Sequence, residues 1–240
     1  MATVCMLYEG CRMETEKILV QESLQETLWR LEEVSQGFRN KSTVQVQEML
    51  EWVLSRQGLE GSYHNLFSPT SLDFTQGLQL PTGERYPARK ALLRHILGEE
   101  ALRTTIIWEL GSSQAVKEAM KGFYQILERG GKNGFYCCHT CTIPFLRTLA
   151  VAKPDDWEKI IDKGLSTIRK SRIPNGRWHG FPFYYTLFML AEIDTSSAQA
   201  ELRHAKKVAE KLLGRFQGND RISRFRRLGL EATLNNTSHN

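Results

Sequence analysis

One segment of the sequence occurs twice, 42 residues apart, and this repeat constrains the fold more than any other feature. Residues 121–136 read KGFYQILERGGKNGFY and residues 163–178 read KGLSTIRKSRIPNGRW, and the two align without a gap. Both hold Lys-Gly, an apolar position, Asn-Gly and a closing aromatic residue. A third, less complete copy, WVLSRQGLEGSY, occupies residues 52–63. Repetition at this spacing predicts stacked supersecondary units.

The hydrophobic pattern predicts an all-α chain of about nine or ten helices, because apolar residues recur at helical spacing while alternating strand patterns are scarce. Each copy is a helix that ends at a glycine turn. The segments after two of these turns, FYCCHTCTIPFLRTLAV and GFPFYYTLFMLAEI, are nearly apolar all round and must be buried on most sides. We therefore expect helical hairpins, with inner apolar and outer amphipathic helices, in a curved array or closed ring.

Length and composition favour one folded domain. The 240 residues are 41% hydrophobic and 25% charged, which is ordinary globular usage. We expect a single domain over residues 1–234, with the repeats between 43 and 216 and a disordered tail at 235–240. The longest apolar run, 181–191, contains Pro182 and is far shorter than the roughly 20 residues of a membrane span. We see no secretory signal, so we expect a cytoplasmic protein with reduced cysteines.

Basic residues gather near the C-terminus. The net charge is +5, and residues 201–228 hold nine Lys and Arg against Glu201, Glu210 and Asp220. This pattern is typical of a solvated helix face, and a phosphate-rich or acidic partner is the alternative. No nucleic-acid-binding motif accompanies the charge, and nucleic acid is not an expected partner.

The repeat resembles that of the squalene and oxidosqualene cyclases, in which Lys-Gly, an aromatic and an aliphatic residue precede Gln-x-x-x-Gly-x-Trp. Tyr63 stands in this sequence where that repeat has Trp, and Arg172 where it has Gln. The matching positions are Trp52, Val53, Gln57, Gly61 and Tyr63, then Lys121, Gly122, Ile126, Gly134 and Tyr136, then Lys163, Gly164, Ile168, Gly176 and Trp178. The resemblance covers residues 43–216.

The resemblance implies a partial or complete α/α toroid of the superfamily that also contains the protein prenyltransferase β subunits. A generic helical-repeat scaffold, such as a HEAT-like array, is the alternative fold. The Asp-x-Asp-Asp acid of the cyclases has no counterpart, since the adjacent pair Asp155 and Asp156 lies at a predicted helix start and is interpreted as a cap. The zinc-binding Asp-x-Cys of the prenyltransferases is also absent, although His139-Thr140-Cys141 resembles their histidine segment.

Cysteines and a histidine cluster after the second glycine turn. Cys137, Cys138, His139 and Cys141 lie at the predicted start of an inner helix, where backbone amides and the helix dipole favour a thiolate. Cys138, His139 and Cys141 are candidate metal ligands, and zinc is the cofactor such residues would hold. Reactive thiols and ordinary apolar packing are the alternatives.

Aromatic residues gather after the third turn, where residues 178–185 hold five rings. Such rings either fill the core or line a cavity in which they would stabilise a cation. Cys138, His139 and His179 are the candidate catalytic residues. The residues predicted to line the cavity are Tyr63, Tyr136, Cys138, His139, Trp178, His179, Phe183 and Tyr185.

Three arginines between the first and second copies are candidates for binding an anion. Arg85, Arg89 and Arg94 lie close together in the sequence, and Arg89 and Arg94 fall near one helix face. Glu99 and Glu100 are the alternative partners of this face through salt bridges.

Three functions fit these observations. The first is a terpenoid-cyclase-like or prenyltransferase-like toroid that binds a hydrophobic, isoprenoid-like molecule in an aromatic cavity. The second is a helical-repeat scaffold that binds a protein partner. The third is a thiol- or zinc-dependent enzyme centred on residues 137–141. The sequence leaves open whether the protein is an enzyme.

Overall fold

The computed structural model describes residues 22–40, 42–215 and 218–235, and over these residues the predicted all-α fold is confirmed. Two short antiparallel hairpins interrupt the helices, and they pair Leu78 with Tyr86 and Arg172 with Trp178. The elements are α1 (Leu24–Ser35), α2 (Thr43–Ser55), α3 (Ser71–Gln76), β1 (Leu78–Gln79), β2 (Arg85–Tyr86), α4 (Lys90–Ile107), α5 (Gln114–Glu128), the 3-10 helix η1 (Gly131–Asn133), α6 (His139–Ala152), α7 (Trp157–Lys170), β3 (Arg172–Ile173), β4 (Arg177–Trp178), α8 (Phe183–Glu192), α9 (Ser196–Leu213) and α10 (Arg221–Asn235).

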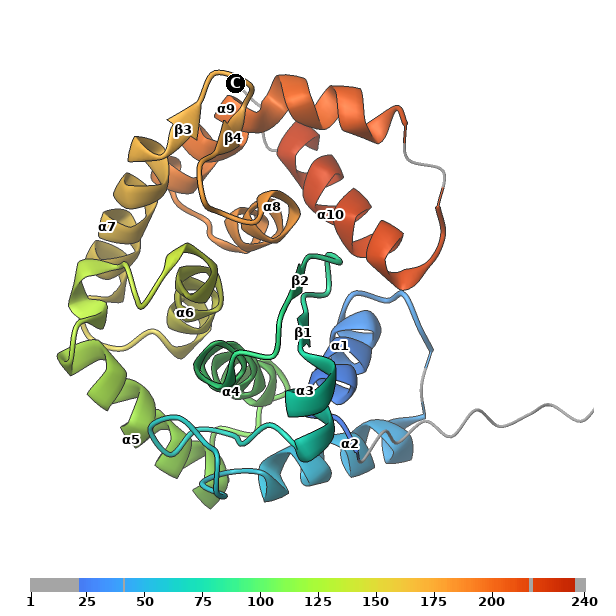
Figure 1. The fold of residues 1–240 in the computed structure, drawn as a ribbon, viewed down its shortest axis with the longest axis vertical. Helices are drawn as coiled ribbons and strands as arrows, with labels where there is room; N and C mark the ends of the chain where they lie inside the picture. The colour runs from blue at the N-terminus through green and yellow to red at the C-terminus, as the bar shows by residue number, and fades with distance from the viewer. Residues whose placement is uncertain (1–21, 41, 216–217, 236–240) are drawn as a thin grey trace, which may run out of the picture.

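The helices lie in an inner and an outer layer (Figure 1). Helices α1, α4, α6, α8 and α10 lie inside, and α2, α5, α7 and α9 lie around them. Contacts run in order from α1 to α4, α6, α8 and α10. An ion pair of 2.7 Å between Arg221 and Glu26 joins α10 to α1, and a contact of 5.4 Å between the rings of Phe225 and Phe38 joins α10 to the segment that follows α1. The two ends of the described chain therefore pack against each other.

The glycines of the repeat have a packing role that the sequence alone did not reveal. A Cβ on Gly122 of α5 would lie 1.7 Å from the carbonyl oxygen of His64, which directly follows the copy at residues 52–63. A Cβ on Gly164 of α7 would lie 2.7 Å from the carbonyl oxygen of Gly134, in the turn of the second copy. Gly134 itself has a φ of +71°, a conformation that glycine adopts without strain. The Lys-Gly of one copy thus receives the turn of the copy before it.

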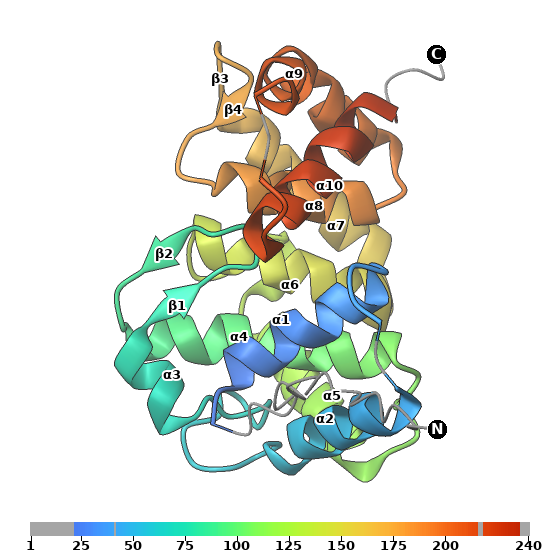
Figure 2. The same ribbon diagram turned by 90° about the vertical axis from the view of Figure 1, so that its right-hand side faces the viewer.

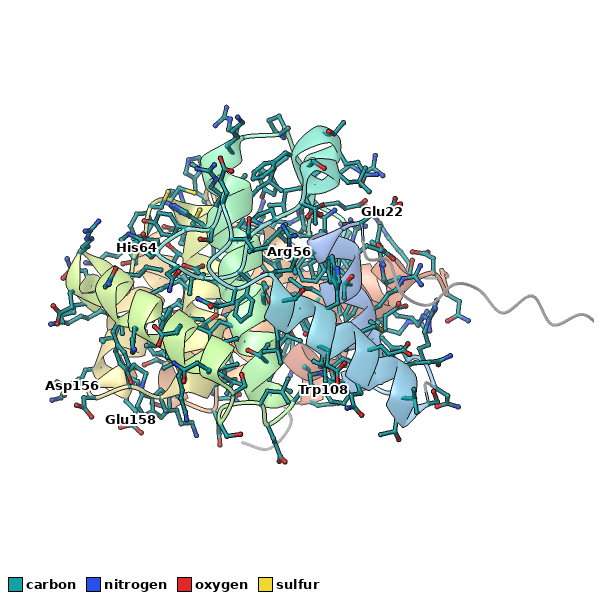
Figure 3. All side chains as sticks on the ribbon, turned by 90° about the horizontal axis from the view of Figure 1, so that it is seen from below. Glu22, Arg56, His64, Trp108, Asp156 and Glu158 are labelled. Atoms are coloured by element: carbon teal, nitrogen blue, oxygen red, sulfur yellow. The ribbon has the colours of Figure 1, made fainter. Side chains whose placement is uncertain are left out.

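The outer helices expose their charged faces. Figure 3 shows Asp156 and Glu158 projecting outward at the start of α7. The prediction that Asp155 and Asp156 cap this helix is wrong in its mechanism, because the N-cap residue Asp156 makes no side-chain cap bond and instead pairs with Lys159 at 2.6 Å. Helix α2 has a true side-chain cap, since Ser42 and Gln45 form a reciprocal capping box at its start.

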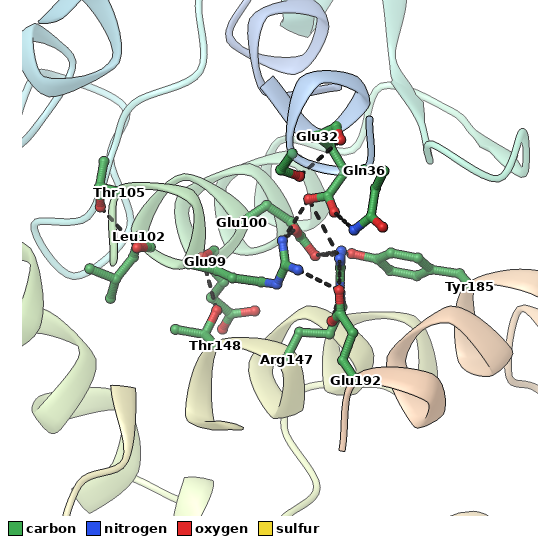
Figure 4. Close-up of polar contacts among 12 residues, drawn as sticks. Glu32, Gln36, Glu99, Glu100, Leu102, Thr105, Arg147, Thr148, Tyr185 and Glu192 are labelled. Atoms are coloured by element: carbon green, nitrogen blue, oxygen red, sulfur yellow. Dashed lines mark hydrogen bonds and ion pairs between the residues drawn. The ribbon is translucent and has the colours of Figure 1, made fainter. Parts of the chain in front are cut away.

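An ionic cluster fills the space where α1, α4, α6 and α8 face one another (Figure 4). Nη1 of the fully buried Arg147 donates to Oε1 of Glu100 at 2.7 Å, and its Nε donates to Oε2 of Glu192 at 2.8 Å. Arg103 donates to Glu32 at 2.6 Å. Burial opposes ionisation of Glu32, but the charges of Arg103 and Arg147 outweigh burial and lower the pKa of Glu32. The space between the inner helices therefore contains buried charged side chains that form ion pairs with one another.

Several predictions concern segments at the chain ends. Helix α10 extends to Asn235, so residue 235 does not belong to a disordered tail. The rest of the predicted tail, 236–240, and the first 21 residues of the predicted domain lie outside the described residues. Among the described helices, none is both long and apolar enough to cross a membrane.

Candidate metal centre

The cysteine segment begins with a strained turn. Cys137 has a φ of +60°, and the N–H of Cys138 donates to the carbonyl of Tyr136 at 2.7 Å, which makes Cys137 the centre of a γ-turn. Turns of this kind with positive φ are rare and strained for a residue that is not glycine. The hydroxyl of Thr142, in the first turn of α6, fixes this γ-turn through two hydrogen bonds. It accepts from the N–H of Tyr136 at 3.1 Å and donates to the carbonyl of Cys138 at 2.8 Å.

This turn brings two cysteines to a histidine of another helix. The ligand atoms of His95 on α4, Cys137 before α6, and Cys141 on α6 all lie within 4.8 Å of one another. Two donor atoms on a tetrahedral zinc ion lie about 3.5–3.8 Å apart, so closure around zinc needs a movement of about 1 Å. The packing of α4 against α6 therefore assembles a group with the donors and approximate spacing of a zinc site.

His95 is prepared to act as a ligand. Its side chain is 7% exposed, and its Nδ1 is buried without a hydrogen-bond partner among the described residues. Burial, and then the nearby charge of His64, lower the pKa of His95 to about 4, so the imidazole is neutral at neutral pH. The ring packs against the ring of Tyr63, with centroids 3.8 Å apart, and lies 5.5 Å from that of Tyr136. Neutral imidazole is the form that binds metals.

Glu99 supplies a buried carboxyl group beside these ligands. It lies one helical turn after His95 on α4, so the two side chains share a face of that helix. The residue is fully buried, and both carboxyl oxygens lack a hydrogen-bond partner within the described part of the chain. Burial, then the charges of Glu100 and Cys138, raise the pKa of Glu99 well above its ordinary value. A cation at the site would reverse this effect by favouring the carboxylate.

The thiols differ in acidity. The Cys141 thiol donates to the sulfur of Cys138, and this bond, together with backbone N–H groups at the start of α6, lowers the pKa of Cys138 to about 5. The same bond, together with burial and the charge of Glu99, raises the pKa of Cys141. Burial chiefly raises the pKa of Cys137. Binding of a metal by Cys137 and Cys141 would therefore release protons.

The observed group differs from the predicted metal ligands, Cys138, His139 and Cys141. Cys141 belongs to it, whereas Cys138 lies beside it and caps α6 through a 3.5 Å bond from the N–H of Cys141 to its sulfur. His139 instead packs edge-on against the rings of Phe135 and Phe181, at 5.4 and 4.6 Å. His95 was missed because no motif links it to the cysteines, which reach it only through helix packing.

The residues predicted to line one cavity lie in separate surroundings. Tyr63 and Tyr136 lie beside His95 and contact each other through their hydroxyl groups. Trp178 stacks on Phe183 with ring centroids 6.0 Å apart, and its indole N–H donates to Glu201 at 3.0 Å.

The remaining two predicted cavity residues, Tyr185 and His179, have different environments again. Tyr185 is fully buried and donates to Glu100 in the ionic cluster (Figure 4). His179 is exposed, and its backbone N–H donates to the carbonyl of Ser171 at 2.7 Å.

The three predicted anion-binding arginines also differ in their environments. Arg85 lines a pocket of about 250 Å³, Arg89 is exposed at the start of α4, and the guanidinium of Arg94 lies 5.8 Å from the ring centroid of Phe74. The alternative that Glu99 and Glu100 pair with this face is wrong. Glu100 pairs with the arginines of the ionic cluster, and the carboxyl group of Glu99 has no partner among the described residues, because both glutamates point into the core.

Comparison with protein-family models, with curated proteins and with solved structures gives no match to this chain.

Proposed function

We propose that this protein binds zinc through His95, Cys137 and Cys141 and uses the metal as a Lewis acid. The observation that carries the proposal is the spacing of the three donor atoms, all within 4.8 Å of one another although they come from two helices. The strained backbone of Cys137 is a cost of folding that a bound metal ion would offset. The Nδ1 of His95, which has no hydrogen-bond partner among the described residues, is a second such cost if the metal binds through this atom.

The donor set favours zinc over other divalent cations. Two thiolates and a neutral imidazole are soft or borderline ligands, whereas magnesium and calcium prefer a shell of oxygen atoms. Among the described residues, Glu99 is a carboxyl group whose charge acts on both Cys137 and Cys141, and a single carboxyl group does not make the oxygen shell of calcium or magnesium. The site should therefore be tested first with zinc.

The number of protein ligands suggests chemistry rather than a purely structural role. Zinc held by three protein ligands keeps a fourth position for water or substrate and lowers the pKa of that water. Cys137 is exposed, so the group can be reached from solvent on one side. Glu99 is fully buried beside the group, where it could accept and return a proton. These features fit a hydrolytic or related Lewis-acid reaction.

Zinc content per chain tests the ligand set. The whole protein, equilibrated with zinc and then desalted, should retain one zinc per chain by elemental mass spectrometry. His95→Gln and Cys141→Ser should lose it, and His139→Gln is the matched control that should keep it. Retention by His95→Gln together with loss by His139→Gln would contradict the assignment. Circular dichroism checks that each variant is folded.

The open fourth position can be tested without a substrate. Cobalt replaces zinc at such sites, and its visible spectrum reports the coordination shell. A pH-dependent change in that spectrum is expected if water occupies the fourth position. A pH-independent spectrum that loses thiolate intensity in Cys138→Ser would instead place Cys138 as a fourth ligand and make the site structural.

The hydrophobic-ligand toroid stays a prediction. The two-layered arrangement of the helices supports it (Figure 1). The ionic cluster, however, lies where the inner helices face one another, and this gives the metal centre the stronger support. A lipid-sized adduct in native mass spectrometry of the purified protein would favour the toroid function.

A further inference from the structure

A pocket of about 540 Å³ lies on the outer layer, between the turn that joins β3 to β4 and one face of α9. Figure 2 shows the hairpin and α9 side by side at one end of the molecule. The pocket is lined by Pro174, Asn175, Gly176, Arg177, His204, Lys207, Val208, Lys211, Leu212 and Arg215. The metal centre shares no residue with it.

The charge of this pocket has one sign. Its lining includes two arginines, two lysines and a histidine, and no acidic side chain. Arg177, Lys207, Lys211 and Arg215 form no ion pair with any of the described residues. The nearest buried acid on α9, Glu201, is already paired with Arg169 and Arg172. The basic excess seen in the sequence is therefore focused into a hollow, and a hollow concentrates anions more strongly than a flat helix face.

The cations are arranged in a row. Lys207, Lys211 and Arg215 follow one another at intervals of four residues, so they lie on one face of α9 and of the residues that directly follow it. Successive residues of this row are about 6 Å apart along the helix axis. Like charges at this spacing repel each other. An anion with several charged groups would relieve the repulsion along the whole row, whereas a single carboxylate would reach only part of it.

The opposite wall is fixed by backbone packing. Gly176 has a φ of +78°, and a Cβ there would lie 3.0 Å from Cγ1 of Val208. The ring of His204 contacts the carbonyl oxygen of Arg177 through Nε2 at 3.2 Å, and the Arg177 guanidinium lies 4.7 Å from the ring centroid of Phe183. The turn and the helix therefore pack tightly, and the Arg177 guanidinium is positioned before a ligand arrives, which lowers the cost of ordering it.

We propose that this pocket binds an oligophosphate, a small molecule with two or more consecutive phosphate groups. The volume lies within the range of small-molecule sites. Arginine and lysine are the side chains that bind phosphate oxygens, Arg by paired hydrogen bonds and Lys as a point charge. Val208 and Leu212 add apolar surface between the cations, which suits a ligand that carries an organic body on its phosphate chain.

Isothermal titration calorimetry on the whole protein tests the proposal with inorganic triphosphate, ATP and orthophosphate as probes. Triphosphate and ATP should bind one per chain, and orthophosphate more weakly by about tenfold or more. Tighter binding of ATP than of triphosphate would show that the pocket recognises a nucleoside as well as the phosphates. Equal binding would show that it recognises the phosphate chain alone. Absence of triphosphate and ATP binding at millimolar concentration would overturn the proposal.

A charge-matched pair of variants separates a site from general attraction. Lys207→Gln/Lys211→Gln removes two cations from the pocket, and Arg203→Gln/Lys206→Gln removes two from the same helix outside its lining. The first should weaken triphosphate binding by about tenfold or more, and the second by less than about twofold. Equal weakening by both would show non-specific attraction and contradict a built site. Neither pair touches a zinc ligand, so zinc content reports the metal centre independently.

Discussion

Replacing Glu99 with glutamine should change how the stability of the metal-free protein depends on pH. The carboxyl group of Glu99 is fully buried, and burial raises its pKa well above the ordinary value of 4.5. The unfolded chain therefore loses this proton near pH 4.5, while the folded chain keeps it to higher pH. The contribution of Glu99 to stability is fully present below the unfolded pKa, and it is lost as the pH rises towards the folded pKa.

The size of the effect follows from one proton. While the carboxyl is protonated in the folded chain and ionised in the unfolded chain, stability falls by up to about 1.4 kcal/mol per pH unit. Between pH 5 and pH 7 the free energy of unfolding of the parent protein should fall relative to Glu99→Gln, by an amount that cannot exceed about 3 kcal/mol for one proton. Urea unfolding at several pH values, with metal removed by a chelator, measures this difference, and other titrating groups cancel in the comparison.

Zinc provides the internal control for this prediction. A cation beside Glu99 favours the carboxylate, so the difference in pH slope between parent and variant should shrink when both are loaded with zinc. Identical slopes in the metal-free proteins would refute the argument, because they would show that the carboxyl of Glu99 is as well solvated in the folded chain as in the unfolded one.

Three further predictions concern single residues. Relative to His95→Gln, the metal-free parent protein should lose stability as the pH falls from about 6.5 towards 4, because the pKa of His95 is lowered to about 4, and the same urea titration measures this difference. Gly164→Ala should destabilise the protein by about 1–3 kcal/mol or more and lower its melting temperature, since the new Cβ would lie 2.7 Å from a carbonyl oxygen. Gly214→Ala is the control, and it should leave the melting temperature nearly unchanged or raised, because its nearest contact is at 3.8 Å. Arg147→Met should cost about 3–5 kcal/mol in chemical denaturation by leaving the buried carboxylates unpaired, and a loss below about 1 kcal/mol would show that the ionic cluster is dispensable.

The inner and outer positions of the helices could be predicted from the sequence, because the apolar residues of each repeat show which helices are buried on most sides. The nearly apolar segments after the turns became the inner helices α6 and α8, and the charged segments before them became the outer helices α5 and α7. The aligned glycines marked each unit. The physical reason for these glycines could not be predicted, because a sequence does not say which backbone a glycine meets. In the structure, Gly134 and Gly164 of adjacent copies approach each other closely.

The candidate site could be predicted only in part. The cysteines were found because they lie close together in the sequence at a helix start. His95 precedes Cys137 by 42 residues (137 − 95), and it reaches the cysteines only because α4 packs against α6. The glutamates at 99 and 100 were misplaced for a similar reason. Spacing along a helix predicts which charges share a face, but it does not tell whether that face meets water or, as for Glu100, a buried arginine.

X-ray absorption spectroscopy at the zinc edge of the loaded protein tests the metal centre most directly. The proposed ligands predict two sulfur atoms at about 2.3 Å and one or more nitrogen or oxygen atoms at about 2.0–2.1 Å. The imidazole contribution should disappear in His95→Gln and persist in His139→Gln. A shell without sulfur, or an imidazole signal that is lost with His139 and kept without His95, would contradict the assignment of this site.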